Sequence, residues 1–274
     1  MKIKPTLLIT LLFLCSAYFA KSQQNEMLSY NFSAQYKKTY KPDSLQKNNL
    51  SENFILLFND HQSAFRSVTR FLLDSIKRTP DYQSMKQLEK VAVNMEYPSN
   101  NEELIQINLD QKEATVTTFA AVMPATDPSY KEKLNLQWKI IDEFKKIKNL
   151  NCKKAEVTAF GRKWTAWFTL DHPYPVGPYK FQGLPGLIVQ IEDATSSYKY
   201  ELYKFKTEKV SYPTIVHDNV KLMSKNEFKT IYESGRYGMS LYAGIELDED
   251  RYKRIETIKR NLKLSENNPI ELIP

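Results

Sequence analysis

The chain has 274 residues, 42% of them hydrophobic and 26% charged, and it carries a formal net charge of +7 at pH 7. A chain of this length can bury enough apolar surface to fold without disulfides or a structural metal. Its basic residues are spread among acidic ones, with no basic stripe interleaved by aromatic side chains. This pattern argues against a nucleic-acid-binding protein, so we expect no nucleic-acid partner.

The first residues are organised like a secretory signal peptide. Residues 1–4 are short and basic, and residues 7–20 form an apolar run without charge. The run is shorter than the ~20 apolar residues that a membrane-spanning helix needs, which argues against the alternative of a retained anchor. Ala20 and Ser22 are small residues at the two positions that signal peptidase recognises. We therefore predict a signal peptide over residues 1–22 and an exported protein.

The two cysteines have different expected fates. Cys15 lies in the apolar run behind Leu14, whereas a lipoprotein signal places a small residue before its cysteine, so we expect no lipid anchor. Cleavage leaves Cys152 as the last cysteine of residues 23–274, which excludes an internal disulfide. Because the neighbouring sequence supplies no base, a buried apolar role is favoured over a reactive thiol.

The N-terminal part of the predicted domain combines strands and helices. Residues 29–36 alternate apolar and polar side chains, which predicts a half-buried strand, and residues 54–58 form a wholly apolar second strand. Apolar residues at helical spacing predict helices over 65–76 and 82–95. Asp81 stands between them as the predicted N-cap of the second.

Short strands dominate after residue 103. The segments 104–108 and 114–119 flank a turn at 110–112 and predict a hairpin, and 136–141 is a further strand. Residues 155–160 and 163–169 predict a tighter hairpin, joined by Gly161-Arg162 with glycine first in a two-residue loop.

The C-terminal third predicts one more hairpin and two helices. Residues 187–192 and 198–205 form the hairpin, and 210–220 add one strand. Ser224 is expected to cap a short helix that ends near Glu233. A last helix over 252–262 has acidic residues at its start and basic residues at its end, which complements the helix dipole.

Consecutive strands joined by short turns imply antiparallel pairing. The predicted fold class is α+β, mainly β, with a curved antiparallel sheet or open barrel. The helices of residues 61–95 and the C-terminal helix are expected to cover part of it. No linker interrupts residues 23–274, so we expect a single strand-rich domain and no transmembrane segment after cleavage.

A segment rich in proline and glycine, residues 171–186, lies between the last two hairpins. It holds three of the seven glycines and four of the thirteen prolines. Proline fixes φ and glycine reaches positive φ, so this density describes a long connection with a defined path. The aromatic residues Tyr174, Tyr179 and Phe181 favour packing of the segment onto the domain.

Within this segment the sequence resembles the GLPGLI family of Bacteroidetes-type bacteria. The hexapeptide that gives the family its name is present as Gly183, Leu184, Pro185, Gly186, Leu187 and Ile188. The resemblance continues through residues 54–58, 138–140, 152–155, 160–162, 164–169 and 177–181. It departs at Asp171-His172-Pro173, where members often carry a Pro-Glu-Ile-Pro-like run.

The resemblance implies an exported protein located in the periplasm or cell envelope of a Gram-negative bacterium. Such proteins are often encoded near outer-membrane TonB-dependent receptors, and the resemblance carries no established activity. From the residues themselves, Gly183 and Gly186 are expected to form a bend that Pro185 stiffens. Leu187 and Ile188 then begin a buried strand, although a binding role for the hexapeptide stays open.

Catalytic and metal-binding patterns were sought and are absent from the sequence. His61, His172 and His217 are far apart, and none has a partner at metal-ligand spacing. A P-loop, a dinucleotide-binding glycine pattern and a nucleophile elbow are also missing, so we predict no cofactor, no metal and no catalytic residue. The predicted binding residues are the aromatic side chains that flank or occupy the Pro/Gly segment: Trp164, Trp167, Tyr179 and Phe181.

Two functions remain. The first is an exported, non-enzymatic binding or accessory protein of the envelope, which holds an apolar or peptide-like ligand or works with an outer-membrane receptor or transporter. The alternative is an envelope hydrolase in which Asp171 and His172 act with a serine or with Cys152.

Overall fold

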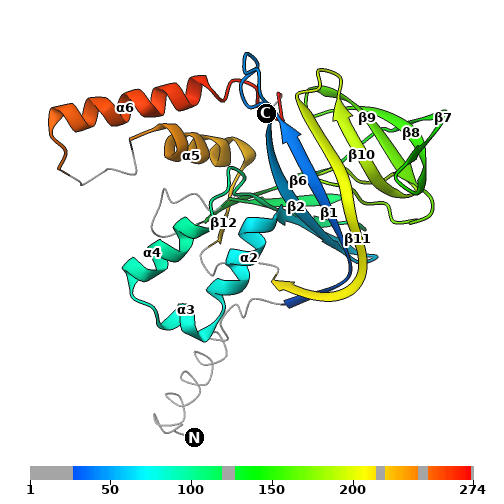
Figure 1. The fold of residues 1–274 in the computed structure, drawn as a ribbon, viewed down its shortest axis with the longest axis horizontal. Helices are drawn as coiled ribbons and strands as arrows, with labels where there is room; N and C mark the ends of the chain where they lie inside the picture. Colours follow the sequence, from blue (N-terminus) through cyan, green and yellow to red (C-terminus); the bar gives the residue numbers. More distant parts are fainter. Residues whose placement is uncertain (1–26, 119–126, 214–219, 240–245, 273–274) are drawn as a thin grey trace, which may run out of the picture.

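The computed structural model describes residues 27–118, 127–213, 220–239 and 246–272 (Figure 1). The predicted signal peptide therefore lies outside the described residues. One sheet contains twelve strands in the order β12-β6-β5-β4-β3-β2-β1-β11-β10-β9-β8-β7. The strands are β1 Met27–Tyr40, β2 Leu50–Phe58, β3 Gln62–Ser67, β4 Leu104–Asn108, β5 Glu113–Thr117, β6 Asp127–Lys133, β7 Lys139–Ile147, β8 Leu150–Ala159, β9 Arg162–Thr169, β10 Leu187–Asp193, β11 Tyr198–Pro213 and β12 Val220–Leu222. The helices are α2 Val68–Lys77, α3 Pro80–Ser84, α4 Gln87–Glu96, α5 Lys225–Tyr237 and α6 Glu249–Leu264.

Two antiparallel meanders make up the sheet. Strands β1 to β6 pair in chain order, as do β7 to β11, and the long strands β1 and β11 join the two halves. β12 pairs with β6 in parallel at one edge. The predicted mainly-β, antiparallel α+β fold is confirmed, with this one parallel pair as the exception.

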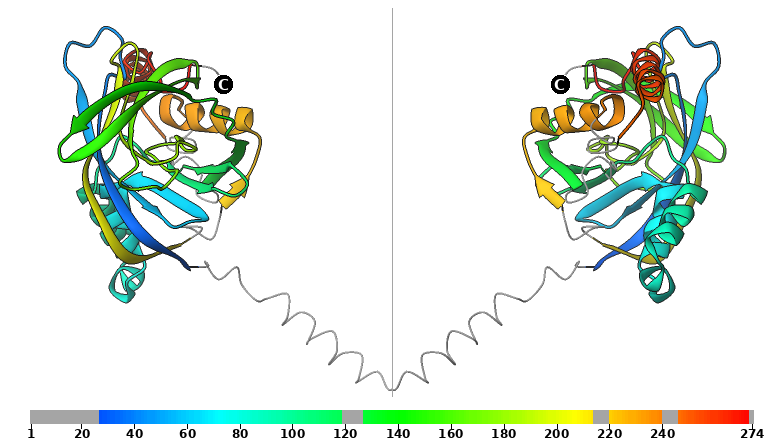
Figure 2. Two further views of the ribbon diagram at one scale, coloured as in Figure 1. Left: turned by 90° about the vertical axis from the view of Figure 1, so that its right-hand side faces the viewer. Right: turned by 90° about the vertical axis from the view of Figure 1, so that its left-hand side faces the viewer.

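The connection between the two meanders forces the sheet to curl. β6 and β7 are ten strand positions apart, which in a flat sheet would separate them by about 48 Å. Only residues 134–138 connect them, and that length of chain reaches at most about 20 Å. The sheet therefore bends back on itself as an open, unclosed barrel (Figure 2).

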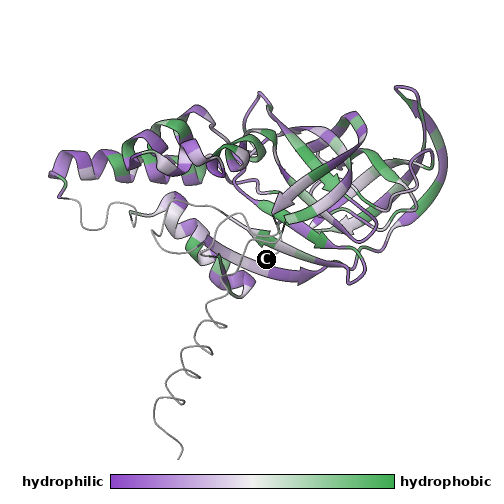
Figure 3. Ribbon diagram, turned by 90° about the horizontal axis from the view of Figure 1, so that it is seen from below, coloured by the Kyte–Doolittle hydropathy of each residue, from purple (hydrophilic) through white to green (hydrophobic). Residues whose placement is uncertain are grey.

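The two faces of the sheet bury separate clusters. On β2, Phe54, Leu56 and Phe58 join the larger cluster, and the alternate residues Ile55 and Leu57 join a smaller one that packs against α2. Burial on both faces explains the unbroken apolar run of this strand. Figure 3 shows hydrophobic and hydrophilic residues intermixed along other strands, as expected where one side of a strand is buried and the other faces solvent.

The predicted helix over 65–76 is wrong at its start. Residues 62–67 form β3, which pairs with β2, and α2 begins only at Val68. The Ser67 hydroxyl accepts a hydrogen bond from the Arg70 amide at 3.2 Å and caps the helix. Phe65 fits the helical spacing of the apolar residues that follow it, but it lies in β3, which pairs with β2.

The second predicted helix is two helices. α3 and α4 are separated at Met85, whose φ of −62° and ψ of 148° are extended. The N-cap of α3 is Thr79 rather than Asp81, because the Thr79 hydroxyl accepts from the Tyr82 amide at 3.3 Å.

The hairpin of β8 and β9 is confirmed, but its turn is one residue earlier than predicted. Ala159 pairs with Arg162, so the loop residues are Phe160 and Gly161. Both have positive φ, 56° and 76°, as the type I′ turn requires. Glycine is thus second in the loop, and the non-glycine Phe160 adopts the left-handed conformation.

The boundaries of two other predicted strands also differ in the structure. The strand expected at 136–141 is β7, displaced to 139–147, and residues 210–213 extend β11 instead of starting a new strand. The remainder of 210–220 includes residues outside the described ranges. The hairpins 104–119 and 187–205 are confirmed within the described residues.

The C-terminal helices form as predicted but cover less of the sheet. Ser224 caps α5 in a capping box with Glu227, and Asp248 caps α6. α5 packs against β6, whereas α6 lies along α5 and buries no residue (Figure 1). Within the described residues, no helix is both long and apolar enough to cross a membrane.

Candidate functional site

The Pro/Gly segment lies in the core of the curled sheet. We call residues 170–186 the motif loop. Val176 and Gln182 form a bridge across it, the Gly183 amide donates to the Pro175 carbonyl at 3.0 Å, and the Ile188 amide donates to the Val176 carbonyl at 3.1 Å. Three of its side chains are buried in the main hydrophobic cluster: Val176, Phe181 and Leu184. The loop therefore packs as a unit that fills the concave side of the sheet.

The two glycines of the hexapeptide have different structural roles. Gly183 has a φ of +93° and makes the predicted bend. Gly186 does not have positive φ; instead a Cβ there would lie 2.0 Å from the Thr169 carbonyl oxygen. Gly186 lies in the bend of residues 184–186, as predicted, but close backbone contact rather than positive φ is what requires glycine there. Leu187 and Ile188 begin β10 and are fully buried, as predicted.

Among the pockets found in the described part of the chain, one is lined by Trp164, and none that we describe is lined by two of the four aromatic residues predicted to bind a ligand. Phe181 is fully buried, with its ring centroid 4.8 Å from that of Trp164, and the Trp164 indole donates to the Ala159 carbonyl at 3.0 Å. Trp167 is partly buried and has the Lys145 ammonium 5.3 Å from its ring. Tyr179 donates a hydrogen bond from its hydroxyl to the side-chain carboxylate of Glu271. Phe181 and Trp164 are therefore core residues.

The residues of the hydrolase alternative do not form an activated nucleophile. Asp171 is exposed, and the His172 ring stacks on Phe205 with centroids 4.2 Å apart. The Cys152 thiol is buried, and burial raises its pKa to about 11, with the charge of Asp171 adding to the increase. A raised pKa disfavours the thiolate that nucleophilic attack requires. Among the described residues, no group of three or more His, Cys, Asp or Glu could hold a metal ion.

The structure reveals a buried charge that the sequence analysis missed. Lys180, in the motif loop, has only 1% of its side chain exposed. Its ammonium donates to the Tyr130 hydroxyl at 2.8 Å and to the carboxylates of Glu132 and Glu271. A lysine is almost never fully buried unless it is paired, so these contacts are needed to keep it there.

A second lysine completes the arrangement. Lys225, the first residue of α5, places its ammonium 2.9 Å from Glu132 and 2.9 Å from Glu271. Two positive and two negative charges thus alternate, and we call Lys180, Lys225, Glu132 and Glu271 the lysine-glutamate cluster. Burial alone would raise the pKa of Glu271, but the lysines outweigh it and hold that pKa below its usual value.

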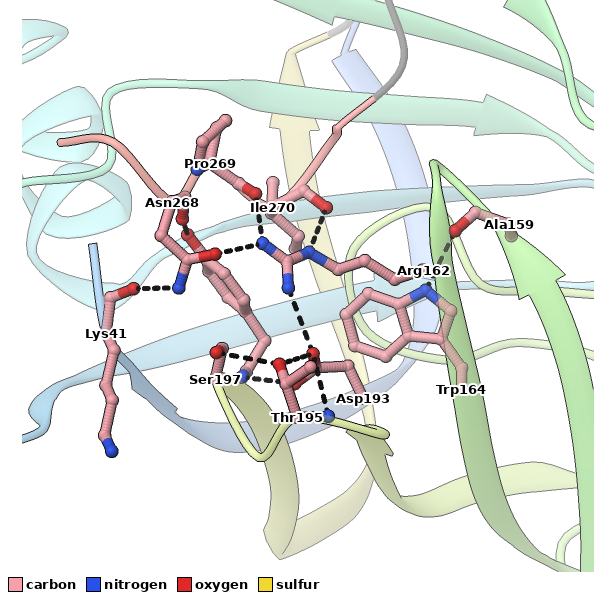
Figure 4. A network of polar contacts seen from close by, with 11 residues as sticks. Lys41, Ala159, Arg162, Trp164, Asp193, Thr195, Ser197, Asn268, Pro269 and Ile270 are labelled. Atoms are coloured by element: carbon pink, nitrogen blue, oxygen red, sulfur yellow. Dashed lines mark hydrogen bonds and ion pairs between the residues drawn. The ribbon is translucent and has the colours of Figure 1, made fainter. Parts of the chain in front are cut away.

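The C-terminal strap, residues 266–272, is held across the domain by Arg162 of β9 (Figure 4). The guanidinium donates to the Asn268 side chain and to the Pro269 carbonyl, both at 2.6 Å, and to the Ile270 carbonyl at 3.1 Å. It also forms an ion pair with buried Asp193 at 3.0 Å. These bonds fix the strap, and with it the Glu271 carboxylate of the cluster.

A pocket of about 170 Å³ adjoins the lysine-glutamate cluster. Its walls come from β6, α5, the strap and the residue before β4. Two of its aromatic rings, Tyr130 and Phe228, meet edge to face with centroids 4.6 Å apart. The main lining residues are Glu103, Tyr130, Lys225, Phe228, Tyr232 and Glu271. Concave sites with apolar walls and a few polar groups are where proteins commonly bind small molecules.

Another buried lysine, Lys38, interacts electrostatically with Glu103. The Lys38 ammonium donates to the Asn101 side chain at 2.6 Å and lies 4.3 Å from the centre of the Tyr40 ring. Burial lowers the pKa of Lys38 to about 8, while Glu103 and Glu52 oppose this shift. Its charge is therefore retained at pH 7 and lost in mildly alkaline solution.

This depressed pKa predicts a pH dependence of stability. Between pH 8 and 10.5 the unfolded chain keeps the Lys38 proton and the folded protein releases it, so the free energy of unfolding should rise with pH. The free energy of unfolding in urea is measured at each pH for the unaltered protein and for Lys38→Met. The difference between the two isolates the contribution of Lys38 from that of the tyrosines. A difference that stays flat or falls from pH 8 to 10 would contradict the assignment.

Comparison with known proteins agrees with the fold and adds no activity. Residues 161–190 match the profile of a family described as a protein of unknown function (Porph_ging). That stretch contains β9, the motif loop and the start of β10. No protein of curated function matches the chain in sequence.

The structure resembles two crystal forms of PNGF-II. The P21 form gives a TM-score of 0.53 at 15% identity over 76% of this chain and 34% of that one. The C2 form gives a TM-score of 0.50 at 14% identity, over 77% and 34%. The chain spans about a third of the length of PNGF-II. It therefore shares a segment with a family of unknown function and its fold with part of PNGF-II.

Proposed function

We propose that the protein is an exported, non-enzymatic binding protein of the cell envelope, and that its ligand occupies the pocket beside the lysine-glutamate cluster. The observation that carries this proposal is the pocket itself. Its rings provide an apolar wall, and the cluster fixes the three segments that form the remaining walls. A site held by buried ion pairs is preorganised, which reduces the ordering that binding would otherwise require.

The proposed location and family are supported by the sequence. Residues 1–22 have the features of a signal peptide, and the hexapeptide 183–188 resembles the GLPGLI family, whose members are often encoded near TonB-dependent receptors. We extend the proposal to a periplasmic or envelope location and to an outer-membrane transporter as partner. Protein released by osmotic shock should begin at Gln23, and cytosolic protein that retains residues 1–22 would argue against this location.

The binding proposal is tested with phenethyl alcohol, a neutral probe with one aromatic ring. Titration into the purified protein should perturb amide signals of α5 and of Tyr130 in ¹H–¹⁵N NMR spectra. Leu272 lies on the wall of the pocket and is about half exposed, so Leu272→Trp should fill the pocket and lower the probe affinity at least about tenfold.

A matched control is Leu170→Trp, which enlarges an equally exposed leucine that is not among the pocket-lining residues. It should leave probe affinity unchanged. Signals that move elsewhere in the protein, or two variants with the same affinity, would refute the pocket as the binding site.

A further inference from the structure

The charges around the pocket are not all balanced. Lys225 and Glu271 neutralise each other within the lysine-glutamate cluster. Glu103 is different, because it is half-buried and, within the described residues, no hydrogen bond or ion pair reaches its carboxylate; the charge of buried Lys38 acts on it only at longer range. A partly desolvated carboxylate without a partner is unfavourable, and a positive group placed beside it would remove that penalty.

Aromatic rings surround the same position. Tyr130, Phe228 and Tyr232 line the pocket together with Glu103. The charge of Glu103 is felt there: burial raises the pKa of Tyr232, and Glu103 contributes the next largest part of that increase. Ring faces attract cations, and a ring beside a carboxylate attracts them more strongly than either group alone.

The one other lysine of the pocket does not cancel this preference. Lys229 is exposed at the rim of the pocket, so water and salt screen its charge, and its long side chain can turn toward solvent. Lys225 already contacts two carboxylates. Glu103 is therefore the carboxylate of the pocket for which the described residues provide no hydrogen bond or ion pair, and Lys38 offsets its charge only at longer range.

We propose that the ligand of this pocket is an organic amine with an apolar or aromatic body, whose ammonium group is bound by Glu103 and whose body packs on Tyr130, Phe228 and Tyr232. This inference rests on the proposed function and specifies its ligand class. A neutral alcohol of the same shape would leave Glu103 unpaired. A carboxylate would be repelled by it.

The test compares three probes of one shape, phenethylamine, phenethyl alcohol and 3-phenylpropionate, by calorimetric titration of the full protein at pH 7. We expect the amine to bind about tenfold more tightly than the alcohol, and the acid to bind most weakly, since a hydrogen bond to a charged group is worth about that factor. Glu103→Gln should abolish the preference for the amine and leave alcohol affinity within about twofold.

Glu143→Gln in β7 serves as the matched control, because it removes a carboxylate far from the pocket and should preserve the preference. The amine-to-alcohol ratio of the unaltered protein provides a readout that depends on no variant. Equal binding of amine and alcohol overturns the ligand class and leaves the proposed pocket intact. Failure of all three probes to bind overturns both.

Discussion

Replacing Lys180 by methionine is expected to lower the free energy of unfolding by about 3–5 kcal/mol. The substitution keeps most of the apolar stem but leaves Glu132 and Glu271 facing each other without the buried ammonium between them. Breaking a buried ion pair by removing one partner is costly because the remaining charge stays desolvated. Urea unfolding followed by tryptophan fluorescence measures the change.

Lys225→Met is the matched control for this experiment. Lys225 contacts the same two glutamates, but 30% of its side chain is exposed, so water can solvate the charges left behind. We expect a loss of about 1 kcal/mol. Adding Glu132→Gln and Glu271→Gln to Lys180→Met should restore part of the stability, since the charge then left in the cluster, that of Lys225, is partly exposed to water. Equal losses for the two lysine variants would show that burial of Lys180 does not matter.

The substitution Gly186→Ala is expected to destabilise the protein by about 3 kcal/mol or more. The added Cβ would lie 2.0 Å from the carbonyl oxygen and 2.8 Å from the carbonyl carbon of Thr169. Both are backbone atoms of β9, the strand that pairs with β10, so neither can move without disturbing the sheet. The thermal midpoint and the urea midpoint should both fall.

Gly183→Ala separates this clash from backbone conformation. A Cβ at Gly183 would meet no atom within 4 Å, but its φ of +93° is unfavourable for alanine. The expected loss is about 1 kcal/mol. If the Gly183 variant proves the less stable of the two, the close approach to Thr169 cannot be the reason for glycine at position 186.

The motif loop has a structural part and a part that contacts the segments lining the pocket. The hexapeptide itself is structural: one glycine bends the chain, the other permits backbone contact, and Leu187 and Ile188 enter the sheet. Lys180 lies three residues before the hexapeptide. Its ammonium binds Glu132 and Glu271 and so connects the motif loop to the walls of the pocket. The same segment therefore fills the core and supports a wall of the pocket.

Local sequence patterns predicted the strands whose side chains are buried in a regular pattern. The apolar run 54–58 and the hairpin around Gly161 formed as strands because their periodicity matches the faces that they bury. Phe65 was assigned to the helix because its spacing from the apolar residues that follow fits a helix, while a single position also fits a strand. Pairing with β2, a tertiary contact, decided the outcome.

The candidate site could not be predicted in the same way. Glu103, Tyr130, Tyr232 and Glu271 come from separate parts of the chain and meet only when the sheet curls and the strap crosses it. The available signal was Lys180, a lysine placed between the aromatic residues Tyr179 and Phe181 of the loop. Of the aromatic residues predicted to bind, Trp164 and Phe181 are buried in the main hydrophobic cluster.

The most direct test of the binding site is a crystal of the protein grown with 4-bromophenethylamine, in which anomalous scattering locates the bromine. The bromine should lie among Tyr130, Phe228 and Tyr232, with the amino nitrogen within hydrogen-bonding distance of the Glu103 carboxylate. Bromine bound at another position, or none at a saturating concentration, would contradict the account.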